Sequence, residues 1–391
     1  MSSRVLQNTE LRNAKVELRR TETEATKVEK IRRFFECLIP VTACNLKCSY
    51  CYVIQRDRRK MKMADLKYTP EQMGEALTRE RLGGICYFSI CGAGETTMQP
   101  EIADIVYHIM KHGHYVNITT NGTVTKIIDE ILERNKDFTD RLHFAFSFHY
   151  LELVRLNLMD RFFDNVKKVR EAGSSFLVQI NLCDDYLPHL DEIKRLCIEH
   201  TGAMPQVAAT RKEETGLRKI ELLTELTEEE YIKAGKTFDS PLFDFTMKNF
   251  NVPRKEFCYA GDWSGNLDLS TGILRRCYCS YLRQDIFKNP KEPIRFLAIG
   301  NMCGSAFCMN SSHFMSLGVI PEVETPTYAE LRNRKEAGWY TPQMEEALSG
   351  KLEEANELYS PLKKAQSNAI GAADNAFRLG VQMIRKRKKR K

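Results

Sequence analysis

The feature that most constrains this chain is a repeated alternation of short apolar runs with longer amphipathic segments. The apolar runs, which suit buried strands, are 34–41, 84–91, 115–120, 142–149, 176–183 and 205–210. Segments with helical spacing of their apolar residues lie between them, at 70–80, 98–113, 124–137, 151–172 and 187–202. Apolar strands alternating with amphipathic helices predict a parallel sheet covered by helices. We therefore expect an α/β fold, a partial (β/α)6 barrel with its chemistry at the carboxyl ends of the strands.

The remainder of the 391 residues differs in character from this repeat. At roughly 100–200 residues per domain, the length suits one large and one smaller domain. A hairpin is expected at 266–277, with its turn at Ser270-Thr271-Gly272. The first expected parts are a charged helical extension at 1–33 and the barrel at 34–215. A helical connector at 216–250 and a small cysteine-rich domain at 251–320 follow. The last expected segment, 321–391, has charged helices up to about residue 365 and a tail at 366–391.

Charge and hydropathy exclude some classes of protein. No run of about 18 apolar residues is present, so no membrane span is expected. The N-terminus lacks the apolar stretch of a secretory signal, which favours the cytoplasm. The net charge is +7, and the seven basic residues 385–391 supply all of it, since 7 − 7 = 0. We expect a solvated tail, and the neutral body disfavours nucleic acid as a partner.

Thirteen cysteines are many for a chain in a reducing compartment, where cysteines more often bind metal than form disulfides. Eight of them are clustered, at 44/48/51, 258, 277/279 and 303/308. The other five lie among apolar residues and are expected to be small buried hydrophobic side chains. Those five are Cys37, Cys86, Cys91, Cys183 and Cys197.

The first cluster is Cys44-x3-Cys48-x2-Cys51, directly after the first predicted strand. Cysteine thiolates on short loops hold iron–sulfur clusters. Three ligands leave one iron of a cubane open, as catalytic metal sites keep one position open. No fourth cysteine or histidine lies close by in the sequence. A zinc site that lacks one ligand is the alternative interpretation.

Polar or small residues follow the next strands in the same way. Gly92-Ala93-Gly94-Glu95 follows the second strand, and Thr119–Thr123, with its Asn121-Gly122 turn, follows the third. Ser147-Phe148-His149 ends the fourth strand. Gln179 and Asn181 alternate with apolar residues on the fifth. The carboxyl ends of parallel strands meet at one edge, so these residues are expected to share one site.

The cysteine motif, with Tyr50 before its last cysteine, resembles the C-x3-C-x-aromatic-C signature of the radical S-adenosylmethionine (SAM) superfamily, over about residues 34–210. The resemblance implies a 4Fe–4S cluster on Cys44, Cys48 and Cys51 whose open iron binds SAM. It also implies contacts to SAM at the strand ends, although Ala93 and an extra glycine depart from the family's Gly-Gly-Glu segment. The implied cofactor-binding residues are Tyr50 near adenine, Gly92, Gly94 and Glu95 at the amine, Thr119 and Asn121 around the pocket, Ser147 at the ribose, and Gln179 or Asn181 at the ribose or carboxylate.

The second cysteine set begins with Cys258-x13-Gly272-x4-Cys277, which resembles the SPASM and twitch extensions of radical SAM enzymes. Only Cys303-x4-Cys308 follows, so there are too few cysteines for two further cubanes. The resemblance implies one auxiliary 4Fe–4S cluster on Cys258, Cys277, Cys303 and Cys308, with Cys279 as an alternate or a bystander. A zinc ribbon is the competing interpretation.

The resemblance implies that one-electron reduction of SAM gives a 5′-deoxyadenosyl radical, which takes hydrogen from a substrate. An auxiliary cluster could accept an electron from the substrate radical, which suggests a net oxidation or dehydrogenation, or it could anchor the substrate. The resemblance also implies an electron donor such as flavodoxin or ferredoxin as a partner. Only about 33 residues precede the first strand, too few for a leader-peptide-binding domain, which favours a small-molecule, sugar or carrier-linked substrate over a peptide. A peptide-modifying enzyme and a non-catalytic iron–sulfur carrier or sensor are the alternatives.

Two residues are the candidate acids or bases, His149 and Asp262. His149 ends the fourth strand, and its alternative is a hydrogen-bonded structural histidine. Asp262 precedes the predicted hairpin. Asp184, Trp263 and His313 are further residues expected to reach the cavity.

Overall fold

The computed structural model describes residues 28–212, 219–305 and 307–389, with the backbone alone from residue 382 onward. Residues 1–27 of the expected N-terminal extension lie outside the described residues. Within the described ranges, no helix is long and apolar enough to cross a membrane. All thirteen cysteines fall inside these ranges, and each is a free thiol.

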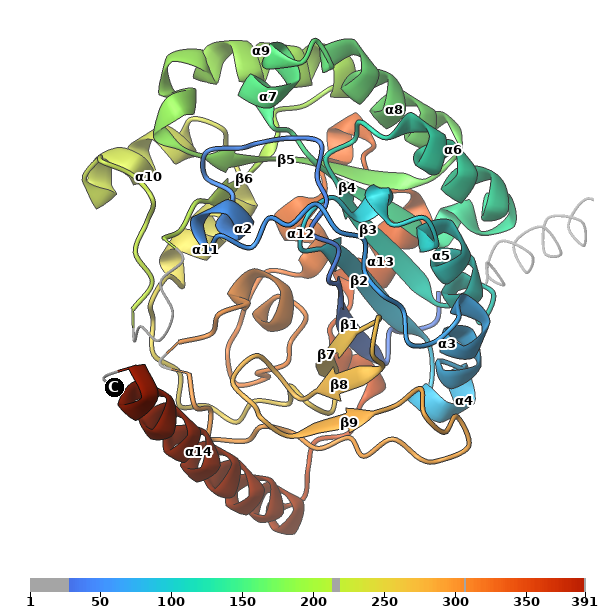
Figure 1. The fold of residues 1–391 in the computed structure, drawn as a ribbon, viewed down its shortest axis with the longest axis vertical. Coiled ribbons are helices and arrows are strands. Elements are labelled where there is room, and N and C mark those ends of the chain that lie inside the picture. Colours follow the sequence, from blue (N-terminus) through green and yellow to red (C-terminus); the bar gives the residue numbers. More distant parts are fainter. Residues whose placement is uncertain (1–27, 213–218, 306, 390–391) are drawn as a thin grey trace, which may run out of the picture.

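Nine strands of the described residues form one open sheet in the order β6-β5-β4-β3-β2-β1-β7-β8-β9 (Figure 1). All pairings from β6 to β7 are parallel, and β7-β8-β9 are antiparallel. The edge strands β6 and β9 do not pair, so the barrel is partial, as predicted. The strands are β1 Arg33–Ile39, β2 Cys86–Gly92, β3 Tyr115–Thr120, β4 Leu142–Ser147, β5 Ser175–Leu182, β6 Gln206–Ala209, β7 Ser264–Asp268, β8 Ile273–Arg275 and β9 Arg283–Asp285.

Helices connect the parallel strands and cover the outer side of the curved sheet, where Figure 1 shows α5, α6, α8 and α9. The helices are α2 Tyr52–Gln55, α3 Pro70–Ala76, α4 Arg79–Leu82, α5 Ile102–Met110, α6 Thr125–Arg134, α7 Tyr150–Arg155, α8 Met159–Glu171, α9 Leu190–Thr201, α10 Glu228–Lys236, α11 Pro241–Lys248, α12 Tyr328–Arg332, α13 Pro342–Ser349 and α14 Pro361–Lys389. Short 3-10 helices lie at Thr96–Met98, Lys136–Arg141, Asp184–His189, Lys335–Ala337 and Leu352–Ala355, and a π-helix at Ser311–Met315.

Two of the predicted helices are each divided in two. The segment 70–80 breaks because the Thr78 side chain caps a new helix, accepting from the backbone of Arg81. The segment 151–172 breaks at Asn157, whose φ of 53° lies in the left-handed region that asparagine tolerates. Neither break disturbs the β/α order, so the strand ends keep their predicted positions.

The hairpin predicted at 266–277 is present as β7 and β8, and Gly272 takes the positive φ of 73° that its turn requires. β7 pairs with β1 in parallel, so the hairpin continues the barrel sheet. The connector is helical where α10 and α11 lie, and α11 packs against β6. This covers one edge of the open sheet.

The segment after the second cysteine set closes the amino-terminal end of the barrel with aromatic rings. Tyr328 on α12 lies 5.8 Å from Tyr87 on β2, measured between ring centroids, and 6.2 Å from Phe34 on β1. Phe34 also stacks on Tyr87 at 5.7 Å and meets Phe314 edge-on at 6.0 Å. Aromatic pairs at these separations add to the stability gained by burial. The cavity inside the barrel therefore has a floor.

The expectation of a tail from residue 366 is wrong, because α14 continues to Lys389. The helix is held by side chains that bond the backbone of the cysteine-rich segment. Asn368 accepts from the Asn301 backbone at 2.8 Å, and Asn375 donates to the Met302 carbonyl at 2.6 Å. Asp374 accepts from the Ser280 hydroxyl at 2.6 Å and from the Tyr281 backbone at 3.0 Å. Of the basic run, Arg390 and Lys391 lie outside the described residues.

Replacing Asp374 with Ala is expected to destabilise the protein by about 1–3 kcal/mol, because two donors lose their buried acceptor. Asp374→Asn, which keeps one acceptor oxygen, should lose less. The free energy of unfolding in urea measures the effect. Glu357→Ala, at an exposed position before α14, is the control and should change it by less than about 0.5 kcal/mol. Equal stability of Asp374→Ala and Glu357→Ala would contradict the role given to α14.

Candidate functional site

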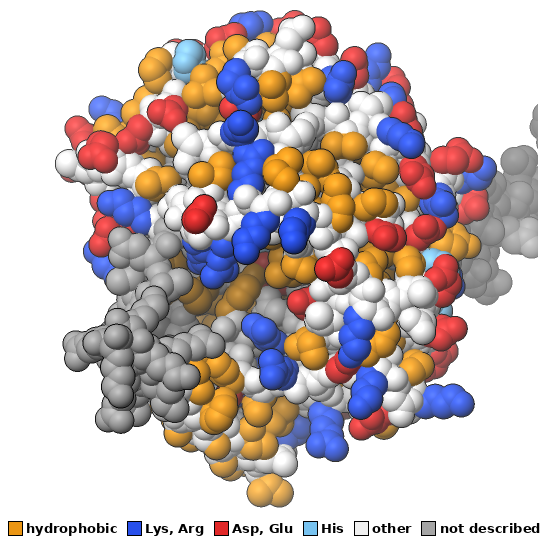
Figure 2. All heavy atoms as spheres, viewed as in Figure 1, with side chains coloured by type: hydrophobic (Ala, Val, Ile, Leu, Met, Phe, Trp, Pro, Cys, Tyr) orange, Lys and Arg blue, Asp and Glu red, His pale blue; other side chains and the backbone are white. Residues whose placement is uncertain are grey.

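A cavity of about 490 Å³ lies inside the barrel, on the side of the strands' carboxyl ends. The three cysteines of the loop after β1 line it together with residues from the six strands β1 to β6. All nine predicted cofactor-binding residues and His149 are among its lining residues. They are Tyr50, Gly92, Gly94, Glu95, Thr119, Asn121, Ser147, Gln179 and Asn181. Figure 2 shows that the face carrying α2 is hollowed near its middle, with Lys and Arg side chains beside the hollow.

The cysteine loop, residues 42–51, rests on the glycine turn, residues 92–95. The Gly94 backbone donates to the Val41 carbonyl at 2.5 Å, and the Glu95 backbone donates to the Ala43 carbonyl at 2.8 Å. A Cβ at Gly94 would lie 2.3 Å from the Ala43 carbonyl oxygen. Glycine is therefore needed here for close approach of two backbones.

Burial shifts the titration of two of the three thiols in the cysteine loop. Burial raises the pKa of Cys44 to about 11 and the pKa of Cys48 to about 12. Such thiols stay protonated at neutral pH unless a bound metal stabilises the thiolate. Within the described residues, no group of three His, Cys, Asp or Glu side chains converges on one metal ion. Cys91, expected to be a buried hydrophobe, is only half-buried and lines the same cavity.

Glu95 is buried and ties neighbouring strand ends together. Its carboxylate accepts from the Thr97 backbone at 2.9 Å and hydroxyl at 2.5 Å, from the Thr120 hydroxyl at 2.6 Å and from the Asn121 backbone at 2.7 Å. Burial raises its pKa. Three of these donors share Oε1 and one reaches Oε2, so Oε2 keeps a lone pair for a further donor. In this conformation Glu95 orders the asparagine turn, residues 119–123.

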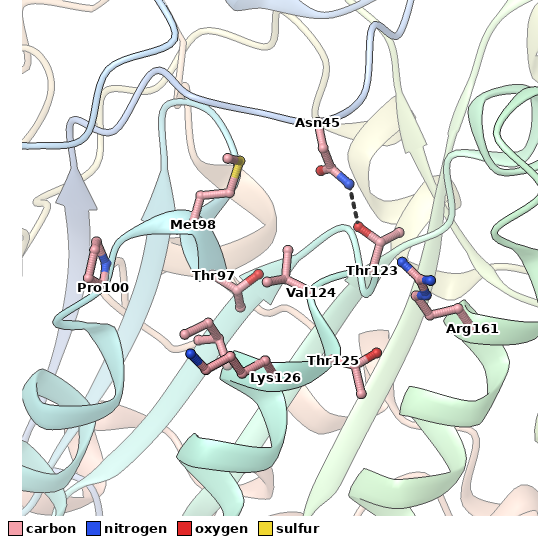
Figure 3. A pocket seen from close by; sticks show the side chains of 10 residues that line it. Asn45, Thr97, Met98, Pro100, Thr123, Val124, Thr125, Lys126 and Arg161 are labelled. Carbon is pink, nitrogen blue, oxygen red and sulfur yellow. Dashed lines mark hydrogen bonds between the residues drawn. The ribbon is translucent and has the colours of Figure 1, made fainter.

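Asn45 joins the cysteine loop to the asparagine turn. Its amide donates to the Thr123 hydroxyl at 2.8 Å, and its carbonyl accepts from Asn121 at 2.8 Å. Figure 3 shows Asn45 and Thr123 facing each other above a second, open cavity of about 750 Å³, with Lys126 and Arg161 on its walls. The three cysteines are not among the residues that line this second cavity. Asn45 was not among the predicted site residues, although it directly follows Cys44.

His149 is held by Tyr50, the aromatic residue of the cysteine motif. The Tyr50 hydroxyl lies 2.6 Å from His149 Nδ1 and 3.0 Å from the Tyr186 hydroxyl. Burial lowers the pKa of His149 to about 4, so the imidazole is neutral at pH 7. A neutral ring can accept a hydrogen bond from the Tyr50 hydroxyl. This agrees with the alternative in which His149 is a hydrogen-bonded structural histidine. The contact fixes Tyr50 beside the thiols.

Asp262 does not line the cavity, and the expectation that it faces a substrate is not met. Its carboxylate forms a buried ion pair with Arg33 at 2.9 Å and accepts from the Tyr359 hydroxyl at 2.6 Å. Trp263 is buried against Tyr259, with ring centroids 3.9 Å apart. Asp184 accepts from the Thr224 hydroxyl and the Glu225 backbone. Of the four residues expected near the cavity besides His149, His313 alone is among its lining residues.

The second cysteine set surrounds a small cavity of about 40 Å³. Cys258, Cys277, Cys303 and Cys308 line it, and so does Cys279. The sulfurs of Cys279 and Cys303 are 3.7 Å apart, so Cys279 lies within the set and not away from it. Burial raises the pKa of Cys308 to about 12. Five thiols thus enclose one space beside the barrel.

Glu36 on β1 lies between the two cavities. It lines the larger one and accepts from the Tyr278 hydroxyl and the Asn310 amide, which both line the smaller one. Burial raises its pKa. Glu36 was not among the predicted site residues, although it is a single acid within the apolar run 34–39.

Comparison with known proteins gives one family and several distant folds. The family model described as the radical SAM superfamily matches residues 38–186. Among solved structures, Streptococcus suis SuiB is 17% identical, with a TM-score of 0.47 over 66% of this chain. The chain covers 64% of SuiB, less than two thirds of its length. No curated protein matches the sequence.

Two further solved structures cover more of the chain. Native anSMEcpe with bound AdoMet is 16% identical, with a TM-score of 0.44 over 90% of this chain and 99% of that one. BtrN in complex with AdoMet and 2-DOIA is 13% identical, with a TM-score of 0.34 over 84% of this chain and 91% of that one. These likenesses are too distant to identify an activity.

Replacing Gly94 with Ala is expected to displace the cysteine loop, because the atoms that the new Cβ meets are backbone atoms of Thr42 and Ala43. The expected loss is about 1–3 kcal/mol of stability, together with a lower iron content after reconstitution. Thermal unfolding and iron per chain are the measurements. Gly380→Ala in α14, where nothing lies within 4 Å, is the control and should keep its iron. A Gly94→Ala protein with unchanged stability and full iron would refute the packing argument.

Proposed function

We propose, on the premise that residues 38–186 make this chain a member of the radical SAM superfamily, that it abstracts hydrogen from a substrate bound in the barrel cavity. The observation that carries the proposal is the convergence of three thiols and the strand-end residues on one cavity. A 4Fe–4S cluster with SAM, bound there, supplies a 5′-deoxyadenosyl radical and methionine by one-electron reduction of the sulfonium.

In this proposal the chain's own residues bind the cluster and SAM, orient the substrate and enclose the cavity. Cys44, Cys48 and Cys51 are the proposed cluster ligands, and Tyr50 is held beside them by His149. The proposed SAM-contacting residues are Gly92, Gly94, Glu95, Thr119, Asn121, Ser147, Gln179 and Asn181. Glu95 acts mainly by fixing the asparagine turn, since its four hydrogen bonds are internal. The aromatic floor excludes water from the far end, which protects a reactive radical.

For the second cysteine set we propose one auxiliary 4Fe–4S cluster in the segment 251–320, whose strands β7, β8 and β9 continue the barrel sheet and do not form a separate domain. Five thiols around one small cavity support it, with Cys258, Cys277, Cys303 and Cys308 as ligands and Cys279 as a replacement. Such a cluster offers a place for the electron that a substrate radical loses, which would make the enzyme an oxidoreductase. The Glu36 contact to Tyr278 sets this site directly beside the substrate cavity.

The cavity favours a small molecule, a sugar or a carrier-linked group as the substrate. About 490 Å³ falls within the usual range for one small ligand, and part of it must hold SAM. The aromatic floor prevents a chain from passing through the barrel. A peptide that inserts a single side chain is the second candidate. A non-catalytic iron–sulfur carrier would not need the polar strand ends that line this cavity.

Anaerobic protein with reconstituted clusters, given SAM and dithionite, is expected to form 5′-deoxyadenosine, detected by chromatography and mass spectrometry. The variant Cys44→Ala/Cys48→Ala/Cys51→Ala should form none, because no thiolate remains for the cluster. Cys197→Ala, at a buried cysteine on α9, is the matched control and should keep the activity. Full cluster loading without any 5′-deoxyadenosine would favour the electron carrier instead.

The same triple variant is expected to retain about four irons per chain on the second cysteine set. Iron and zinc contents, with the visible absorption of the purified protein, provide the measurement. Adding Cys258→Ala and Cys308→Ala should remove this iron as well. If the triple variant contains zinc but no iron, the second cysteine set is a zinc ribbon and the auxiliary cluster is contradicted.

A further inference from the structure

Polar side chains form a row across the inside of the barrel, well below the strand ends. In the strand register Glu36 is opposite Ser89, Ser89 is opposite Asn117, and Asn117 is opposite His143. His143 precedes Ser147 by four residues on β4, a distance of about 13 Å at the usual rise per strand residue. This row therefore belongs to a deeper compartment than the proposed SAM contacts.

Arg332, the last residue of α12, lines this compartment and is only 2% exposed. Its guanidinium carbon lies 3.7 Å from the centroid of the Tyr328 ring, and its Nη2 donates to the Ser312 carbonyl at 2.8 Å. Its Nη1 is buried and has no hydrogen-bond partner among the described residues. An unpaired nitrogen on a buried cation is costly, so an anionic guest would complete this site.

Three more buried polar atoms around Arg332 lack a partner within the described part of the chain. They are His143 Nε2, His313 Nδ1 and Asn117 Oδ1, and all three residues line the cavity. Burial lowers the pKa of His143 to about 3 and also lowers that of His313, so both rings are neutral at pH 7. Such atoms in native proteins usually mark a ligand or an ordered water.

Two acids, Glu36 and Glu95, line the cavity, and within the described residues neither forms an ion pair with Arg332. Glu36 accepts from the neutral donors Tyr278 and Asn310, and Glu95 accepts from neutral donors of residues 97, 120 and 121. Two more arginines, Arg59 and Arg211, line the same cavity. The charge of the cavity therefore favours an anionic guest.

We propose that Arg332 binds a carboxylate of the substrate at the floor of the barrel, and this rests on the proposed function. A guanidinium binds a planar carboxylate through two parallel hydrogen bonds. One unpaired cation flanked by neutral histidines matches one negative charge, whereas a phosphate brings up to two. The reacting C–H then lies on the side of the carboxylate that faces the cysteine loop. The substrate class is thus a carboxylic acid that enters the barrel acid first.

Binding of three matched probes tests the proposal: phenylacetate, phenethyl alcohol and benzylphosphonate. Ligand-observed NMR on the anaerobic holoenzyme, with and without SAM, gives their dissociation constants. We expect phenylacetate to bind about 10- to 100-fold more tightly than the alcohol, and more tightly than the phosphonate. Arg332→Met should reduce the preference for acid over alcohol to about 2-fold or less, and Arg332→Lys should restore part of it.

Arg195→Met, at an exposed arginine on α9, is the control and should keep the preference. Iron content and thermal unfolding report whether Arg332→Met folds. If Arg332→Met does not fold, the binding of the three probes to the wild type and to Arg332→Lys tests the proposal. The proposal is overturned by equal binding of acid and alcohol, by no measurable acid binding, by tightest binding of the phosphonate, or by a preference that survives in Arg332→Met. Absence of 5′-deoxyadenosine from the wild type would instead overturn the proposed function, while an acid preference would remain valid.

Discussion

The contact between the cysteine loop and the glycine turn positions everything else in this site. Two backbone hydrogen bonds, from Gly94 to Val41 and from Glu95 to Ala43, join the loop after β1 to the turn after β2. They form because β1 and β2 pair in parallel and end at the same level. The side chain of Glu95 then bonds the turn after β3, and Asn45 closes the connection back to the cysteines. Three strand ends are thus held as one rigid support for the thiols.

The inside of the barrel combines this support with polar groups that the fold leaves incomplete. Asp262 and Arg33 satisfy each other, and so do Glu36, Tyr278 and Asn310. Arg332 and its neighbours do not. Unpaired buried polar atoms also occur elsewhere, as at Arg276, but those of Arg332, His143, His313 and Asn117 line one cavity. In the proposed arrangement the cofactor end of the cavity is at the cysteine loop and the substrate end is at α12.

The sequence was sufficient for the barrel and for the residues at the strand ends. The spacing of apolar residues and the composition define each β/α unit. Because parallel pairing brings the strand ends together, Cys44, Glu95, Asn121 and Ser147 could be grouped from the sequence alone. Local patterns do not report contacts between distant segments. The pairing of Asp262 with Arg33, the packing of α14 and the return of Arg332 to the barrel floor depend on such contacts. They could not be predicted from residue spacing.

The central claim is that Cys44, Cys48 and Cys51 hold a cubane with one iron open to SAM. Electron–nuclear double resonance on the reduced protein with SAM labelled by nitrogen-15 at its amine tests it most directly. The auxiliary cysteines are best replaced by alanine, so that a single cluster contributes to the signal. The account predicts a nitrogen-15 coupling that is present with SAM and disappears with S-adenosylhomocysteine labelled only in its adenine. A reduced cluster whose spectrum shows no amine coupling at saturating SAM would contradict it.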